Sequence, residues 1–233
     1  MRKITFLFLT AILLGSCKKT TTNEELATPT QDITGFVFLY NQYQQSLPNN
    51  SGVTVTLSGT SYSAVTDSAG MYVIKNVPAG TYQFVYTKSG YGTYEVNHFY
   101  TLGGDVSLIP VSLYQNSTAT LTNVKATYSN QGITVTGTVN SGASAQQEVN
   151  VIVYYSLSPS VSPSNYMAVT TGGANPSFEL YLGTNEYFTS GQTVYMVAYG
   201  ITSTTPFTDP ATNTITYTSL SATPSAVVNI TVQ

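Results

Sequence analysis

The chain has few of the residues on which catalysis, metal binding and covalent cross-linking usually depend. Its 233 residues include one cysteine, one histidine and no tryptophan, and only 7% of them are charged. A single cysteine excludes an internal disulfide, and a single histidine excludes a multi-histidine metal centre and a His–Cys dyad. The net charge is −3 and Lys and Arg are not clustered, so the chain lacks the basic surface that nucleic-acid binding requires.

The acidic residues do not form a pattern typical of a hydrolase. Glycosidases need two carboxylates across a cleft, but Glu24 and Glu25 are adjacent in a polar N-terminal stretch and the other acids are scattered. His98 lies in the sequence Val96–Tyr100, which predicts a strand position rather than a member of a catalytic triad. We therefore expect no enzyme activity, no catalytic residue, no metal and no cofactor.

The residues that are abundant form β-structure. Thr, Ser, Asn, Val and Tyr replace the missing charges, and β-branched and aromatic side chains fit a pleated surface. Residues 52–59 alternate between apolar and polar types, as do residues 81–88, which predicts half-buried strands. The buried positions of these two strands are expected to be Val53, Val55, Leu57, Tyr82, Phe84 and Tyr86. Residues 33–40 (ITGFVFLY) predict a strand that is apolar on both faces.

The N-terminus is organised as a leader. Arg2 and Lys3 precede an apolar stretch, residues 4–14, that is too short for a permanent membrane span. The following Leu14-Gly15-Ser16-Cys17 resembles the lipobox of bacterial lipoproteins. The resemblance implies that residues 1–16 are a cleaved signal peptide and that Cys17 carries the lipid anchor. Residues 17–30 are then expected to form a flexible tether.

Residues 31–115 form the first predicted domain. Gly35-Phe36-Val37 is followed in order by further sequence blocks at residues 52–57, 66–72, 76–82 and 90–91. This series resembles the carboxypeptidase regulatory-like family and implies a seven-stranded, transthyretin-like sandwich. In that family the blocks are structural and the domain serves for display or docking. The block Asp67-Ser68-Ala69-Gly70 predicts a hairpin between residues 62–66 and 71–74.

Residues 116–233 form the second predicted domain. Its short apolar runs, separated by turns, predict about seven strands and an immunoglobulin-like sandwich. Residues 193–199 resemble a strand of fibronectin type III domains. The strands are expected at residues 121–128, 132–140, 147–156, 177–182, 192–200, 214–218 and 226–232. The glycine pairs at 103–104 and 172–173 lack the context of a phosphate loop and are predicted to be turns.

Two sets of side chains are candidates for a site. Tyr40, Tyr43, Tyr91 and Tyr166 lie in or beside predicted loops, where a tyrosine can stack on a sugar ring or simply pack. Ser68 in Asp67-Ser68-Ala69 resembles a short O-glycosylation motif of exported bacterial proteins; a plain turn is the alternative.

Together these features predict an all-β, lipid-anchored lipoprotein of a Gram-negative outer membrane, on the cell surface or on the periplasmic face. We expect a non-catalytic protein that uses its sandwiches for protein interaction or adhesion. The alternative is a glycan-binding accessory lipoprotein for polysaccharide uptake. Aromatic residues aligned on an exposed sheet face would favour glycan binding, whereas a flat hydrophobic patch would favour a protein partner. Expected partners are thus the membrane, through the lipid, and an envelope protein or glycan, but not nucleic acid.

Overall fold

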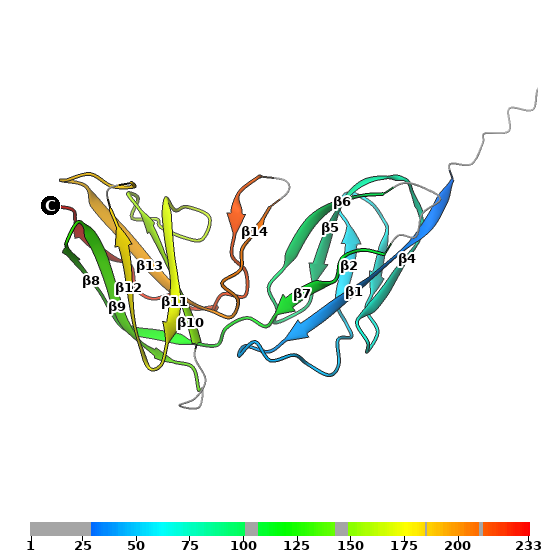
Figure 1. Ribbon diagram of the computed structural model, residues 1–233, viewed down its shortest axis with the longest axis horizontal. Helices are drawn as coiled ribbons and strands as arrows, with labels where there is room; N and C mark the ends of the chain where they lie inside the picture. Colours follow the sequence, from blue (N-terminus) through cyan, green and yellow to red (C-terminus); the bar gives the residue numbers. More distant parts are fainter. Residues whose placement is uncertain (1–28, 101–106, 143–148, 185, 210–211) are drawn as a thin grey trace, which may run out of the picture.

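The computed structural model describes residues 29–100, 107–142, 149–184, 186–209 and 212–233, except for the side chains of residues 98–100. These residues form strands and connecting segments without a helix, so the prediction of an all-β fold of sandwich domains is confirmed. Figure 1 shows two sandwiches arranged end to end along the long axis. In the described ranges no helix is long and apolar enough to span a membrane. The leader and most of the tether, residues 1–28, lie outside the described part of the chain.

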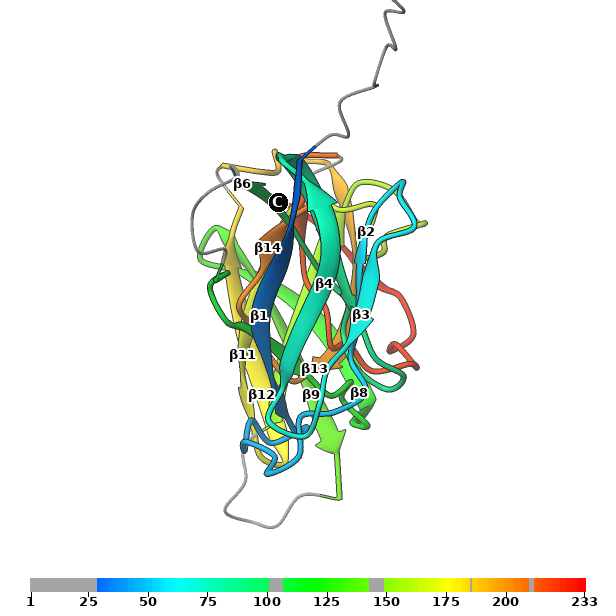
Figure 2. The ribbon, with the colours of Figure 1, turned by 90° about the vertical axis from the view of Figure 1, so that its right-hand side faces the viewer.

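The first domain is built from a three-stranded and a four-stranded sheet. In sheet order, the first sheet contains β4 (Met71–Pro78), β1 (Thr30–Tyr40) and β7 (Val111–Tyr114). The second contains β3 (Ser63–Val65), β2 (Thr54–Leu57), β5 (Gly80–Thr87) and β6 (Tyr94–Tyr100). The central strand β1 pairs antiparallel with β4 and parallel with β7. In Figure 2, β1 and β4 lie side by side at the front of this domain.

The core of the first domain lies between the two sheets. Val53, Val55, Leu57, Phe84 and Tyr86 are fully buried there, as the alternation in the sequence predicts, and Tyr82 packs against them half-buried.

A hydrogen bond between two tyrosines links the sheets inside this core. The hydroxyl oxygens of Tyr72 on β4 and Tyr86 on β5 are 3.0 Å apart, and the rings meet in an edge contact at 6.1 Å. Burial raises the pKa of both phenols, and for Tyr86 the neighbouring Tyr72 raises it further. Phenols are neutral at physiological pH in any case, and burial favours this form further, so the two side chains hold the sheets together as a neutral pair.

The turn at Asp67–Gly70 crosses from one sheet to the other, so the hairpin prediction is wrong in its pairing. The preceding strand β3 pairs with β2, whereas the following strand β4 pairs with β1. The turn itself is tight: the Gly70 amide donates to the Asp67 carbonyl at 3.0 Å, and the Met71 amide donates to the Asp67 carboxylate at 2.9 Å. Gly70 has a φ of 89°, and a Cβ at this position would collide with the Val37 carbonyl oxygen, so this corner requires glycine.

The second domain also packs two sheets. The three-stranded sheet contains β12 (Ser177–Gly183), β9 (Gly132–Asn140) and β8 (Thr120–Ser129). The four-stranded sheet contains β11 (Ala168–Ala174), β10 (Val149–Ser156), β13 (Thr193–Ile201) and β16 (Val228–Thr231). Among the fully buried core residues between the sheets are Ile133, Val135, Val151, Val153, Val194 and Met196.

Strand β11 is absent from the sequence prediction, because its sequence AVTTGGA has no alternation and contains a glycine pair. Gly172 and Gly173 are therefore strand residues, paired with Val151 and Asn150, and the prediction of a turn at this pair is wrong. A glycine is present here because of packing: a Cβ on Gly172 would be 2.5 Å from the Leu180 side chain, so only a residue without a side chain leaves room for Leu180.

A second apolar cluster lies outside the main core, on the outer face of β10 and β13. The Tyr154 ring is at its centre, 5.1 Å from Tyr166, 5.9 Å from Tyr199 and 6.4 Å from Tyr217. Tyr166 and Tyr217 belong to two connecting segments, which the Tyr166 hydroxyl joins by donating to the Ile215 carbonyl at 2.9 Å. The cluster thereby fixes the base of a small hairpin formed by β14 (Phe207–Thr208) and β15 (Ile215–Thr216).

Candidate binding cleft at the domain junction

The two domains contact each other through backbone and side-chain hydrogen bonds. The Gln42 side-chain oxygen accepts from the Thr118 amide at 3.1 Å and from the Thr118 hydroxyl at 2.6 Å. The Ser117 amide donates to the Ser219 carbonyl at 3.0 Å. The Tyr43 hydroxyl donates to the Ser141 carbonyl at 3.4 Å, a long and therefore weak bond. These contacts hold the segment that links the domains against both of them.

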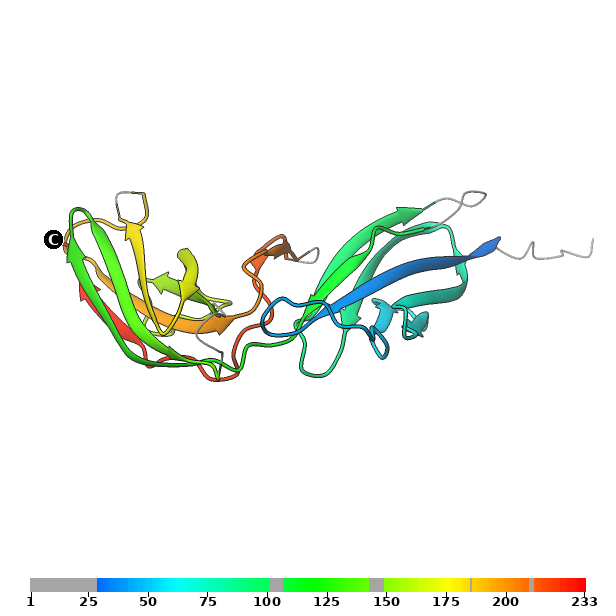
Figure 3. The same ribbon diagram turned by 60° about the horizontal axis from the view of Figure 1, so that its bottom comes forward.

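The β14–β15 hairpin of the second domain reaches the first domain beside β6. Figure 3 shows this orange hairpin standing between the two domains. The Phe207 ring lies 5.3 Å from the Tyr94 ring, and the two planes are inclined by 56°. Nearby, Gly92 allows the segment of Thr218 and Ser219 to approach closely, since a Cβ on Gly92 would lie 2.6 Å from the Ser219 amide nitrogen. Gly92 and the contact between the Tyr94 and Phe207 rings together set the relative orientation of the two domains.

A cleft of about 390 Å³ lies at this junction. The first domain supplies one wall, from the start of β6 and from β7, and the second domain supplies the other wall from the hairpin and the segments beside it. The cleft is lined by Gly92, Tyr94, Val96, Ile109, Pro110, Val111, Ser112, Leu113, Tyr114, Ser203, Thr205, Pro206, Phe207 and Thr218. No charged side chain is among them, so the cleft is an uncharged, largely apolar cavity with several hydroxyl groups.

The rings and hydroxyl groups of the cleft are held in different ways. Tyr114 is stacked on Tyr40 with ring centroids 5.0 Å apart, so its ring has a fixed orientation. Within the described chain, the hydroxyl groups of Ser112, Thr205 and Thr218 make no side-chain hydrogen bond. The rings are thus ordered by the protein, while these three hydroxyls are available to a ligand.

The outer face of the β4-β1-β7 sheet is a second surface of interest, and it adjoins the cleft through Ser112 and Tyr114. Between its charged end and the cleft, this outer sheet face consists of Thr34, Phe36, Phe38, Tyr40, Met71, Val73, Ser112 and Tyr114. Phe38 is 39% exposed and Met71 is 40% exposed. The corresponding outward positions of β9 are Thr134, Thr136 and Thr138, the polar pattern expected of a solvated sheet face. The outer sheet face departs from that pattern with aromatic and aliphatic side chains.

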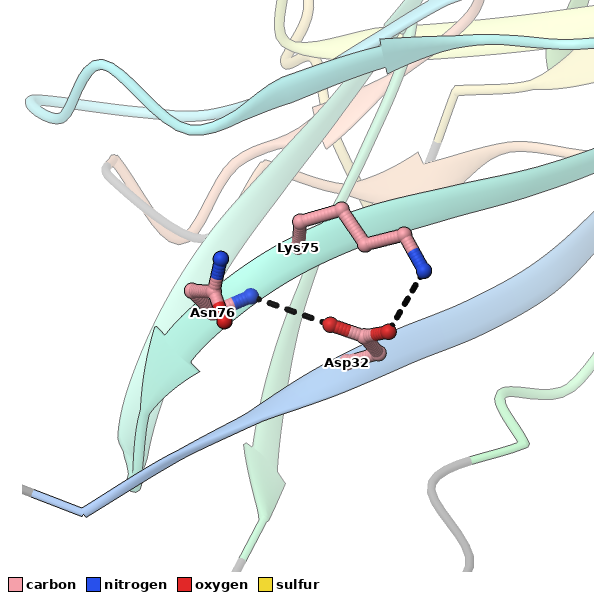
Figure 4. A network of polar contacts seen from close by, with 3 residues as sticks. All are labelled: Asp32, Lys75 and Asn76. Carbon is pink, nitrogen blue, oxygen red and sulfur yellow. Dashed lines mark hydrogen bonds and ion pairs between the residues drawn. The ribbon is translucent and has the colours of Figure 1, made fainter.

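The charged groups at one end of the outer sheet face neutralise each other (Figure 4). The Lys75 ammonium donates to the Asp32 carboxylate at 2.6 Å, and the Asn76 amide donates to its other oxygen at 3.1 Å. The hydrogen bond from Lys75, followed by that from Asn76, lowers the pKa of Asp32 below its ordinary value. Because both side chains are exposed, the pair contributes little to stability, but it leaves the outer sheet face without net charge.

The four tyrosines proposed from the sequence lie next to the cleft or away from it, and none lines it. Tyr40 stacks on the lining residue Tyr114, and Tyr43 bonds to the second domain. Tyr91 packs against the first core, with the Lys88 ammonium 6.0 Å from its ring centre. Tyr166 packs against Tyr154 in the cluster outside the second core. A ligand-facing role for these four side chains stays a prediction.

Sequence reasoning missed Tyr94, Tyr114 and Phe207. Tyr94 begins β6 and alternates in phase with the core-facing Val96, whereas Tyr114 ends β7 on the outward face; neither pattern marks a cleft, which forms only where the two domains meet. Phe207 offered a usable signal: it is a large aromatic residue in a Pro-containing connection that has no apolar periodicity.

The remaining sequence candidates are placed only in part. Ser68 is exposed on the turn between β3 and β4, so its hydroxyl is accessible, and its glycosylation stays a prediction. Cys17 and the turn predicted at residues 103–104 lie outside the described residues, whereas His98 is in β6, the strand position expected. Across the ranges that the structure covers, no group of three His, Cys, Asp or Glu side chains could hold a metal ion.

Comparisons with known proteins give structural similarities of low score. A candidate carbohydrate binding protein from Bacteroides uniformis matches at 14% identity and a TM-score of 0.35, covering 88% of this chain and 100% of that one. A DUF3823 family protein from Parabacteroides merdae matches at 13% identity and a TM-score of 0.36, covering 87% and 99%.

A chain of a type II cohesin–X-dockerin complex from Acetivibrio cellulolyticus is 31% identical over 37% of this chain and 59% of that chain, with a TM-score of 0.32. No protein-family model matches the chain, and neither does any curated protein. Similarities of this size do not identify a function.

Proposed function

We propose that the chain is a non-catalytic protein of the bacterial envelope that uses its β-sandwich domains to bind a protein partner or an adhesion surface. Cys17 carries the lipid that anchors it to the outer membrane, and the residues between Cys17 and the start of β1 at Thr30 form the tether. The first domain is of the carboxypeptidase regulatory-like type and the second of the immunoglobulin or fibronectin type III kind. The seven strands of the first domain, and the tight turn at the Asp67–Gly70 block, support this assignment.

The outer sheet face carries the proposal. Uncovered apolar side chains on a sheet face gain free energy when a partner covers them, and contiguous patches of this kind mark protein interaction sites. Aromatic residues in a row are also typical of sugar-binding platforms. Here, however, Phe36 pairs with Met71, and Val73 lies on the same face of β4 beside Met71; neither Met71 nor Val73 offers the strong hydrogen-bonding groups that sugar hydroxyls require. The face therefore suits a protein surface better.

The test is photo-crosslinking in cells that make the full chain. A benzoylphenylalanine at position 38 is expected to form an adduct with one discrete partner, because Phe38 is at the centre of the outer sheet face. The matched control is the same probe at Thr81, an exposed position on the opposite sheet. The Cys17→Ser variant should lose the adduct because it is no longer held at the membrane. Equal adducts at positions 38 and 81, or none at position 38, would contradict the proposal.

Glycan binding is the second candidate function, and the junction cleft is the observation that favours it. The cleft combines three aromatic rings with unpaired hydroxyl groups and contains no charged side chain. This site is separate from the outer sheet face except at Tyr114 and Ser112, so both functions can be tested independently.

A further inference from the structure

The junction cleft has the size and chemistry of a small-molecule site. Small-molecule sites have volumes of about 300–1,000 Å³, are mostly apolar, and contain a few polar groups that orient the ligand. The cleft of about 390 Å³ falls at the lower end of this range. A ligand of this size corresponds to one or two rings rather than to a folded partner.

The lining decides what kind of ligand the cleft accepts. A charged ligand would lose hydration without gaining an opposite charge, which is costly in an apolar cavity. A purely apolar ligand would cover the hydroxyls of Ser112, Thr205 and Thr218 without pairing them, which also costs free energy. A ligand with apolar ring faces and a rim of neutral hydroxyls satisfies both requirements.

We propose that the junction cleft binds a single neutral sugar ring, whose apolar face packs on the Phe207 ring with the inclined Tyr94 ring at its edge, and whose hydroxyls bond to Ser112, Thr205 and Thr218. The proposal rests on the second candidate function above and adds its ligand class and the residues that contact the ligand. The two rings come from different domains and are already in contact at 5.3 Å with their planes inclined by 56°, so this aromatic corner exists before the ligand arrives. The bound sugar would then bridge both domains.

The test is isothermal titration of the purified chain with maltotriose, cellotriose, xylotriose and mannotriose, alongside trigalacturonic acid as the charged comparator. At least one neutral trisaccharide is expected to bind, and the acidic one is not. Phe207→Ala should weaken that binding at least tenfold, and Thr205→Val should weaken it less. The matched control is Tyr181→Ala, which removes an exposed tyrosine on β12 outside the cleft and should leave binding unchanged.

Each contrary result has a distinct meaning. If no neutral trisaccharide binds, the ligand class and the second candidate function both fail, while crosslinking at position 38 still decides the first. If a sugar binds equally to the Phe207→Ala and parent chains, but not to Phe38→Ser, glycan binding stands and its place in the cleft is overturned. Equal binding of trigalacturonic acid overturns the requirement for a neutral ligand. Amide exchange of each variant confirms that both domains are folded.

Discussion

At the scale of single residues, the core of the first domain contains a hydrogen bond whose contribution to stability depends on both of its partners. Tyr72 and Tyr86 are buried, and each hydroxyl has the other as its partner at 3.0 Å. A buried hydroxyl without a partner loses its hydration and gains nothing in return. The two hydroxyls therefore stabilise the core only when both are present, and one buried hydroxyl without the other destabilises it.

This reasoning predicts a strongly non-additive pair of substitutions. Tyr72→Phe or Tyr86→Phe alone should lower the free energy of unfolding by about 1–3 kcal/mol, because each leaves one buried hydroxyl unpaired. The double variant should lose no more than either single one, since both polar atoms are gone. Urea unfolding of the full chain, with the first domain followed by amide exchange in β4 and β5, measures the difference. Losses that simply add would contradict the pairing.

At the scale of elements, turns decide how the strands are distributed between sheets. The alternation in β2 and β5 identifies which side chains are buried but does not say which strands pair. The corner at Gly70 sends β4 to the sheet of β1 instead of back along β3. It can do so because Gly70 lies in the left-handed region and its missing side chain leaves room for the Val37 carbonyl.

Gly59 and Gly70 both have a positive φ, so together they separate the cost of the left-handed backbone from the cost of a Cβ collision. Gly59 has a φ of 74° and no atom within 4 Å of the place that a Cβ would occupy, so Gly59→Ala should cost only the backbone term of about 1–2 kcal/mol. Gly70→Ala should cost at least about 1 kcal/mol more, because its Cβ also collides with the Val37 carbonyl. Chemical denaturation of the two variants gives the comparison. Equal losses would show that the collision relaxes at no cost.

At the scale of the whole molecule, the junction sets one orientation of the domains. The ring contact between Tyr94 and Phe207 and the close approach at Gly92 lie on the same side, next to the cleft. Because the hairpin base is held by the tyrosine cluster around Tyr154, the second domain presents Phe207 from a supported position.

Gly92→Ala tests this orientation. The new Cβ would lie 2.6 Å from the Ser219 amide nitrogen, so the segment must withdraw and the domains should change their relative angle. Residual dipolar couplings should then give a different alignment between the domains, while the couplings within each domain stay the same. The control is Gly183→Ala, at a glycine with open space around its Cβ position. An unchanged alignment in Gly92→Ala would mean that Gly92 does not control the angle.

The sequence by itself determined the all-β class and the buried faces of β2 and β5, because alternation and β-forming composition act locally. It did not reveal β11, whose glycines follow no pattern, or the sheet crossing at Gly70, because strand pairing depends on contacts between distant segments. The junction cleft was decided by the tertiary structure alone. Tyr94, Tyr114 and Phe207 come from three separate elements, and only the meeting of the two domains brings their side chains to one cavity.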